Sequence, residues 1–141
     1  MSLSLSLSFN GTCREAFGVY AGLLGGTITF MATYAESPMA SQVSAAMQSR
    51  IMHATLRTDD LTLMGSDVPP DDYQPPQGFG IVLGLSDPAE AARLFAAFAD
   101  GGSIVLPLEP TFWAAAFGVV QDRWGVTWQI NCESAAPRPG R

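Results

Sequence analysis

The chain has 141 residues, 48% of them hydrophobic and 14% charged, and a formal net charge of −6. These values describe one globular domain that is long enough for a sizeable core, and they exclude a disordered chain. The seven basic residues form no stripe along the sequence, so we expect no nucleic-acid partner. The N-terminus alternates Leu and Ser without a charged leader or a continuous apolar run. This pattern predicts neither a signal peptide nor a membrane partner, and a cytoplasmic location follows as the default.

The chain begins with the pattern of a strand followed by a helix. From Leu3 to Phe9, large apolar residues alternate with serines, which is the period of a strand with one apolar face. A helix is expected over residues 13–24, because apolar residues recur there at helical spacing. Asn10 or Thr12 is the predicted capping acceptor, and Gly25-Gly26 is predicted to end the helix in a left-handed cap.

The rest of the first half predicts three more strands, at 27–33, 50–57 and 61–66. Between the first two, residues 35–49 favour a short helix or a loop. The strand at 50–57 alternates, and its two predicted faces are Met52, Ala54 and Leu56 on one side and Ile51, His53, Thr55 and Arg57 on the other.

The second half repeats this order after a proline-rich linker at 68–78. A strand is expected at 79–85, then a helix at about 89–99 that is capped by Ser86 or Asp87. Its inward side chains are predicted to be Ala92, Leu94, Phe95 and Phe98. Further strands follow at 103–106, about 117–121 and 126–132, with a turn at 107–111 and a flexible tail at 134–141. The chain thus divides into units 1–67 and 79–133, which we expect to form one compact domain.

The two halves can be aligned with each other. A shift of 76 residues places Phe9 on Leu85 and Gly25-Gly26 on Gly101-Gly102, and a shift of 65 aligns the final strands. The difference of 11 residues falls in the irregular stretch at 35–49. An α+β fold is therefore expected: two tandem βαβββ units forming cupped mixed sheets around a shared cavity, with the helices outside.

This repeat resembles the vicinal oxygen chelate superfamily of glyoxalase I, bleomycin-resistance proteins and extradiol dioxygenases. Within it, the chain is most similar to the PhnB-like group, also labelled 3-demethylubiquinone methyltransferase-like. The residues that carry the resemblance span nearly the whole chain: Leu7-Ser8-Phe9-Asn10-Gly11, Tyr20, Leu24-Gly25-Gly26, Met52-His53-Ala54, Leu56-Arg57, Gly65-Ser66-Asp67, Thr111-Phe112-Trp113, Phe117-Gly118, Asp122, Gly125, Trp128 and Asn131. The resemblance implies a homodimer and a superfamily that includes lyases and dioxygenases.

The resemblance also locates the positions at which metal-dependent relatives hold a divalent ion. Those positions fall on Ser4, Met64, Gly80 and Gln129, none of which is a histidine or a carboxylate. A thioether, a hydroxyl and an amide are poor ligands for a hard cation, and glycine has no side chain. We therefore predict no metal, no other cofactor and no metal-activated reaction.

The candidate ligand-binding residues are His53, Arg57, Met64, Phe112, Trp113, Gln129 and Ser8. His53, the only histidine, either binds an anion or acts as a base, or it fills space beside its neighbours. Arg57 is an anion partner or a solvated surface residue, and Asp67 is interpreted as a turn former. Phe112 and Trp113 favour an aromatic lid over a flat ligand, although core packing or a dimer contact fits equally. Ser8 and Gln129 offer neutral hydrogen bonds.

No nucleophile–base pair is visible, and Cys13 and Cys132 lack metal or redox spacing, which predicts two free buried thiols. The leading hypothesis is a protein that binds a small organic molecule in a metal-free cavity, as sequestering resistance proteins do. The alternative is a lyase or isomerase that uses His53 or an atypical metal site. The methyltransferase label is a third possibility, but no nucleotide-type cofactor motif supports it.

Overall fold

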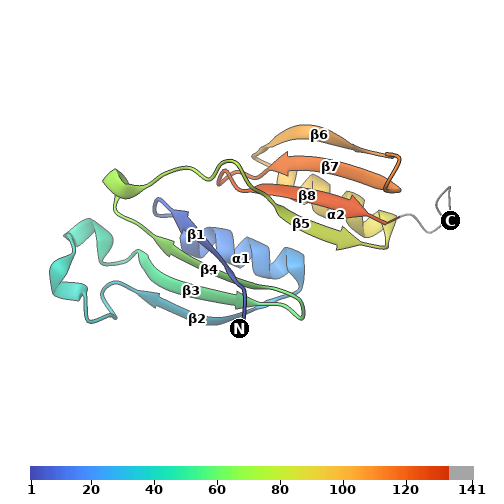
Figure 1. Cartoon of the computed structure of the whole chain (residues 1–141). Helices are drawn as coiled ribbons and strands as arrows, with labels where there is room; N and C mark the ends of the chain where they lie inside the picture. The colour runs from blue at the N-terminus through green and yellow to red at the C-terminus, as the bar shows by residue number, and fades with distance from the viewer. Residues whose placement is uncertain (134–141) are drawn as a thin grey trace. The chain divides into compact units, whose positions relative to one another are not determined.

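The computed structural model describes residues 1–133 and divides into two compact units, Met1–Pro75 and Pro76–Arg141. The expected tail at 134–141 lies outside the described residues. In the first unit the elements are β1 (Leu5–Phe9), α1 (Cys13–Leu24), β2 (Thr27–Thr33), β3 (Ile51–Arg57) and β4 (Thr62–Asp67). In the second they are β5 (Ile81–Leu85), α2 (Pro88–Ala99), β6 (Ser103–Glu109), β7 (Ala116–Gln121) and β8 (Thr127–Cys132) (Figure 1). The predicted α+β fold of two tandem βαβββ units is confirmed.

The two units repeat each other in strand order and in register. The first sheet has the order β1-β4-β3-β2 and the second β5-β8-β7-β6, and in each only the first pair is parallel. Leu5 pairs with Leu63 in the first unit, and Ile81 pairs with Trp128 in the second. These pairs are related by the shifts of 76 and 65 residues found in the sequence. The irregular stretch of the first half forms two short 3₁₀ turns, Ala40–Gln42 and Ala45–Met47.

Each helix covers one face of its own sheet, and that face forms the core. In the first unit Phe17 packs edge-to-face on Phe9, with ring centroids 6.1 Å apart. In the second, Phe98 stacks on Trp128 at 4.3 Å. The fully buried side chains of these two cores include Tyr20, Leu56, Leu63, Val120 and Ile130. Burying side chains of this size contributes about 1.5–3 kcal/mol each, so these two layers dominate the stability of each unit. No helix among residues 1–133 has the length and apolar character needed to cross a membrane.

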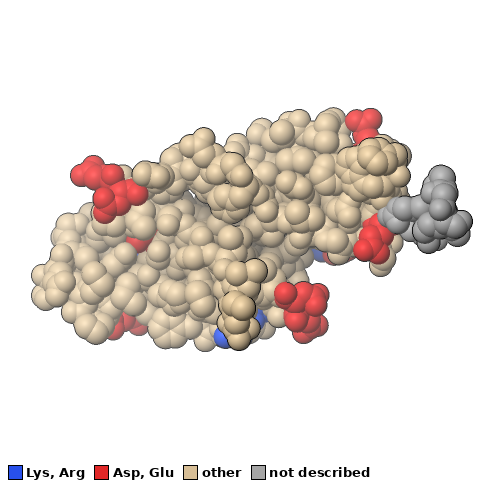
Figure 2. Space-filling view, viewed as in Figure 1, with Lys and Arg blue, Asp and Glu red and all other residues tan. Residues whose placement is uncertain are grey.

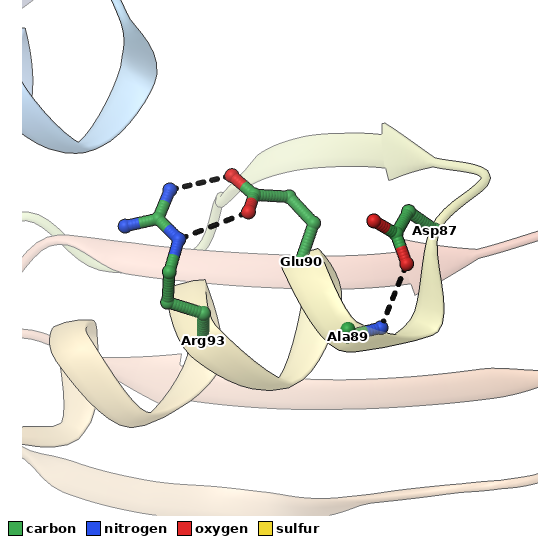
Figure 3. A network of polar contacts seen from close by, with 4 residues as sticks. All are labelled: Asp87, Ala89, Glu90 and Arg93. Atoms are coloured by element: carbon green, nitrogen blue, oxygen red, sulfur yellow. Dashed lines mark hydrogen bonds and ion pairs between the residues drawn. The ribbon is translucent and has the colours of Figure 1, made fainter.

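The helix ends follow the predicted chemistry only in part. Gly25 closes α1 with φ 66° and ψ 34°, the left-handed conformation that glycine adopts without a Cβ penalty. Asp87 caps α2 as predicted, accepting a hydrogen bond from the Ala89 N–H at 3.0 Å (Figure 3). On the next turn, Arg93 donates to Glu90 and lowers the pKa of that exposed carboxyl (Figure 3).

The prediction that Asn10 or Thr12 caps α1 through its side chain is wrong. Thr12 occupies the cap position without a side-chain hydrogen bond. Instead, Asp67 at the end of β4 accepts hydrogen bonds from the N–H groups of Gly11 and Cys13, at 2.9 and 3.0 Å. Its other oxygen accepts from Ile51 N–H at 2.8 Å. Because Asp67 is only 1% exposed, this carboxylate is an internal support and not the turn former we expected.

Two face assignments also need correction. Ile51 is buried and Met52 is half-exposed, the reverse of the predicted strand faces, because the register between β2 and β3 shifts between the pairs of His53 and Ile51. Such a bulge inserts one residue and changes which face the following side chains occupy. In α2 the small inward residue is Ala91 and not Ala92, which places Ala91, Leu94, Phe95 and Phe98 at regular helical spacing.

Three predicted strand ends are displaced. β1 begins at Leu5 and not Leu3, and β5 begins at Ile81 and not Phe79, since the first backbone pairs of these strands form there. β6 extends to Glu109, through the predicted turn that begins at Pro107. A proline is tolerated there because β6 is an edge strand with irregular register on both sides of Leu106.

Candidate functional site

The face of the first sheet opposite α1, its open face, carries a row of neighbouring side chains from four strands. Ser6 pairs with Met64, Met64 pairs with Thr55, and Thr55 pairs with Phe30. Residues that pair directly across strands point to the same side of a sheet. Phe30 remains 51% exposed while Thr55 is 8% exposed. The row therefore offers a hydroxyl, a thioether and an aromatic ring on one surface, with Met64 near its centre.

His53 lies on this open face beside Thr55 and Phe30. Its Nε2 is 3.2 Å from the Thr55 hydroxyl oxygen, and its ring is 5.9 Å from the Phe30 ring. The imidazole is half-buried. The sequence did not identify Phe30 as a neighbour, because a register shift between Ile28 and Phe30 sets its position. The only signal was its place in the adjacent strand.

The other predicted residues of the first unit are further apart. Arg57 ends β3, four residues beyond His53, and pairs with Thr27 and Thr62. At about 3.3 Å per residue, this places Arg57 roughly 13 Å from His53 along the strand. Ser8 lies on β1, paired with Ser66 and exposed. The structure thus brings together His53, Thr55 and Met64, with Arg57 and Ser8 at the margins of the face.

The open face of the second sheet is more apolar. Gln129 on β8 lies between Val82 of β5 and Val119 of β7. A Cβ placed on Gly80 would lie 3.3 Å from the Gln129 amide nitrogen, so the absence of a side chain there leaves room beside this amide. Val82 is 57% exposed. Gln129 is the central polar group of a surface formed mainly by aliphatic side chains.

Three aromatic rings gather at the other end of β7 on this open face. Trp113 lies 4.9 Å from Phe112 and 5.2 Å from Phe117, both in edge-to-face orientations. Its Nε1–H donates to the Asn131 Oδ1 at 3.2 Å. Phe117 and Asn131 form a cross-strand pair, so they point to the same side. The sequence did not assign either to the site, although Asn131 fell on the predicted polar face of its strand.

The residues at the expected metal positions do not fit a divalent cation. Ser4 is exposed and lies before β1, Met64 offers a soft thioether, and Gln129 offers a neutral amide beside Gly80. Among residues 1–133, no group of three or more His, Cys, Asp or Glu side chains is placed to hold a metal. No step of a reaction is therefore derived through a metal at these positions.

The buried carboxylates and thiols have structural roles. Asp122 accepts hydrogen bonds from the backbone of Trp124 and Val126 and from the Trp128 indole N–H at 2.9 Å. Cys13 and Cys132 are both buried free thiols, as predicted. Burial, together with the nearby Asp67 charge, raises the pKa of Cys13 to about 12. This thiol stays protonated at neutral pH, which excludes it as a nucleophile because the thiolate is the reactive form.

Comparison with known proteins agrees with the repeat and the fold. The model of the family described as 3-demethylubiquinone-9 3-methyltransferase matches residues 2–131. Protein YjdN of Escherichia coli K12 is 35% identical over 145 residues, covering 97% of this chain and 99% of YjdN. The solved structure of protein PA1353 from Pseudomonas aeruginosa is 46% identical, with a TM-score of 0.82 over 94% of this chain and 98% of that one.

A second solved structure extends the likeness of fold. It is a putative 3-demethylubiquinone-9 3-methyltransferase, PhnB protein, from Bacillus cereus, with a TM-score of 0.78 at 22% identity over 94% of this chain and 99% of that one. The repeated βαβββ unit and these matches lead to one assignment. This chain belongs to the 3-demethylubiquinone-9 3-methyltransferase family, the PhnB-like group of the vicinal oxygen chelate superfamily.

Proposed function

We propose that this protein binds a small organic molecule on the open faces of its sheets without a metal ion. The single observation that carries the proposal is the composition of those faces. They combine exposed aromatic rings with a few neutral polar groups, Thr55, Gln129 and Asn131, which is the usual make-up of a small-molecule site. The cavity that the sequence predicts stays a prediction. Binding without turnover would resemble the action of sequestering resistance proteins.

The lack of a second acid–base group beside His53 favours binding over catalysis. Its printed polar neighbour is the Thr55 hydroxyl, and Asp67 and Asp122 are occupied by backbone and indole N–H groups. The second candidate function is a lyase or isomerase in which His53 is the proton acceptor. The half-exposed position of His53 and its bond to Thr55 favour it, because a positioned imidazole can transfer protons near neutral pH.

A mixed-charge fragment screen tests the binding proposal. Hits found by thermal shift should move the amide resonances of β3, β4, β7 and β8 in a two-dimensional NMR titration. His53→Gln and Gln129→Ala should weaken such hits, and Gln77→Ala, an exposed linker change, is the matched control. A ligand at 100 times its Kd adds about 2.7 kcal/mol to the free energy of unfolding, which a melting curve resolves. An empty screen, or hits that map only to the helix-covered faces, would contradict the proposal.

Two further measurements separate the alternatives. Elemental analysis of protein purified without chelator should show no stoichiometric metal, and calorimetry should show no binding of S-adenosylmethionine. Loss of a measured turnover in His53→Gln, with an unchanged circular dichroism spectrum, would favour the enzyme.

We also propose that the protein is a cytoplasmic homodimer. The two unpaired buried thiols favour a reducing compartment. The support for a dimer is β6, an edge strand with Ile104 and Val105 more than half exposed. An exposed apolar edge of this kind is commonly covered by another chain.

A further inference from the structure

The aromatic corner of the second sheet, formed by Phe112, Trp113 and Phe117, has more exposed aromatic surface than packing requires. Phe112 is 91% exposed and Trp113 is 40% exposed. Both rings stand edge-on to their neighbours, at 83° between Phe112 and Trp113 and 65° between Trp113 and Phe117. Ring faces are therefore presented in different directions around one point.

The corner is held in place by hydrogen bonds of its own loop. Thr111 N–H donates to the Ala114 carbonyl oxygen at 3.1 Å, and Ala114 N–H donates to the Thr111 hydroxyl at 3.2 Å. Asn131 on β8 accepts from the Trp113 indole. Because the loop and the indole are both fixed, the exposed rings form a surface that needs little ordering when a ligand binds.

The charge around the corner is negative. Glu109, at the end of β6, is exposed and pairs with Phe117, so its carboxylate lies on the same side of the sheet. The two arginines of the described part of the second unit lie elsewhere: Arg93 binds Glu90 on α2, and Arg123 lies near Asp100 and Trp124, at the turn between β7 and β8. Figure 2 shows that uncharged atoms cover most of the surface over β5 to β8 in this view.

We infer that the aromatic corner binds an organic cation, a quaternary or protonated amine carried on a flat apolar ring. Aromatic faces attract cations through their quadrupole, and grouped aromatic rings are the typical receptor for quaternary ammonium. Glu109 adds charge complementarity, while the net charge of −6 disfavours anions. This inference rests on the proposed function and adds the chemical class of its ligand.

Three probes of similar ring size and different charge test the inference by calorimetry at pH 8: N-methylquinolinium, neutral quinoline and 2-naphthoate. The cation should bind about 2- to 30-fold more tightly than quinoline, as expected for a cation over aromatic rings. The anion should bind most weakly. Raising the salt concentration should reduce the cation's advantage, because the Glu109 carboxylate is exposed.

Two variants and one control assign the effect to the corner. Trp113→Leu should weaken both quinoline and N-methylquinolinium at least several-fold. Glu109→Gln should weaken only the cation, by about 1.4- to 5-fold, the range for an exposed charge pair. Trp124→Leu removes an indole at the opposite end of β7 and β8 and should leave all three affinities unchanged. Near-ultraviolet circular dichroism checks that each variant is folded.

Several outcomes would overturn the inference. They are equal or tighter binding of 2-naphthoate, an unchanged cation affinity in Trp113→Leu, or no binding of any of the three probes. The general binding proposal survives these outcomes if the fragment screen gives hits that map to the open faces. It fails separately if that screen is empty.

Discussion

At the scale of single residues, the most consequential side chain is a buried carboxylate that supports three segments of the first unit. Asp67 accepts N–H hydrogen bonds from Gly11, Cys13 and Ile51, and its carbonyl oxygen accepts from the Tyr34 hydroxyl at 2.7 Å. Burial, together with the Asp67 charge, raises the pKa of Tyr34. One residue thereby joins the start of α1 to the start of β3.

Replacing Asp67 by Asn tests this role. Asn keeps one acceptor oxygen, but its NH₂ group would face a backbone N–H and leave it unsatisfied. Each buried N–H bond to a charged group contributes about 1.5–3 kcal/mol, so we expect the free energy of unfolding to fall by about 2–4 kcal/mol. Urea denaturation measures it, and Asp60→Asn, an exposed turn change, is the control. A loss below about 0.5 kcal/mol would show that the carboxylate is dispensable.

At the scale of the elements, glycines mark where helix and strand approach closely. A Cβ on Gly118 in β7 would lie 2.7 Å from the Phe95 ring and 2.9 Å from the Leu108 backbone. Gly65 in β4 has the same relation to Phe17, at 2.6 Å. In contrast, a Cβ on Gly84 in β5 would meet nothing within 4 Å. Close packing between sheet and helix therefore depends on Gly65 and Gly118 but not on Gly84.

The pair Gly118→Ala and Gly84→Ala tests this difference with the same chemical change. Gly118→Ala forces the Phe95 ring or the β6 backbone to move, an overpacking that costs about 1–3 kcal/mol. Gly84→Ala should be neutral or stabilise by about 0.4–1 kcal/mol, because alanine restricts the unfolded chain. Thermal and urea unfolding of both variants measure the difference. Equal effects would mean that α2 does not constrain the sheet as the structure indicates.

At the scale of the whole molecule, the proposed dimer depends on the edge of the second sheet. Residues from Ser103 to Leu108 carry no charge in a chain with a net charge of −6. A self-interface is favoured where like charges are absent, since two copies repel each other elsewhere. Pro107 lacks an N–H group, and the register of β6 is irregular, so we expect contact through side chains and not a continuous sheet.

Val105→Lys should therefore shift the protein from dimer to monomer in analytical ultracentrifugation. The added cation lowers the net negative charge, so general repulsion cannot explain dissociation. Val19→Lys makes the same change at a 40% exposed position on α1 and should leave the dimer intact. A wild-type monomer at all concentrations, or a Val105→Lys dimer of unchanged affinity, would count against this interface.

The sequence by itself determined the repeat, the two helices with their glycine ends, and most strands. It could do so because alternation and helical spacing are local properties, and the same shifts appear in both halves. It also determined that Met64, Gly80 and Gln129 offer poor metal ligands, since ligand chemistry depends on residue type alone.

Only the tertiary structure decided which distant groups meet. Asp67 caps a helix that begins 54 residues earlier, a contact for which no local pattern exists. Register shifts in β2 and β3 placed Ile51 in the core and Phe30 beside His53, and a bulge leaves no reliable trace in composition. The bond between Trp113 and Asn131 likewise joins a loop to a strand 18 residues away. Such contacts depend on the register of paired strands, which the whole sheet fixes and no single segment encodes.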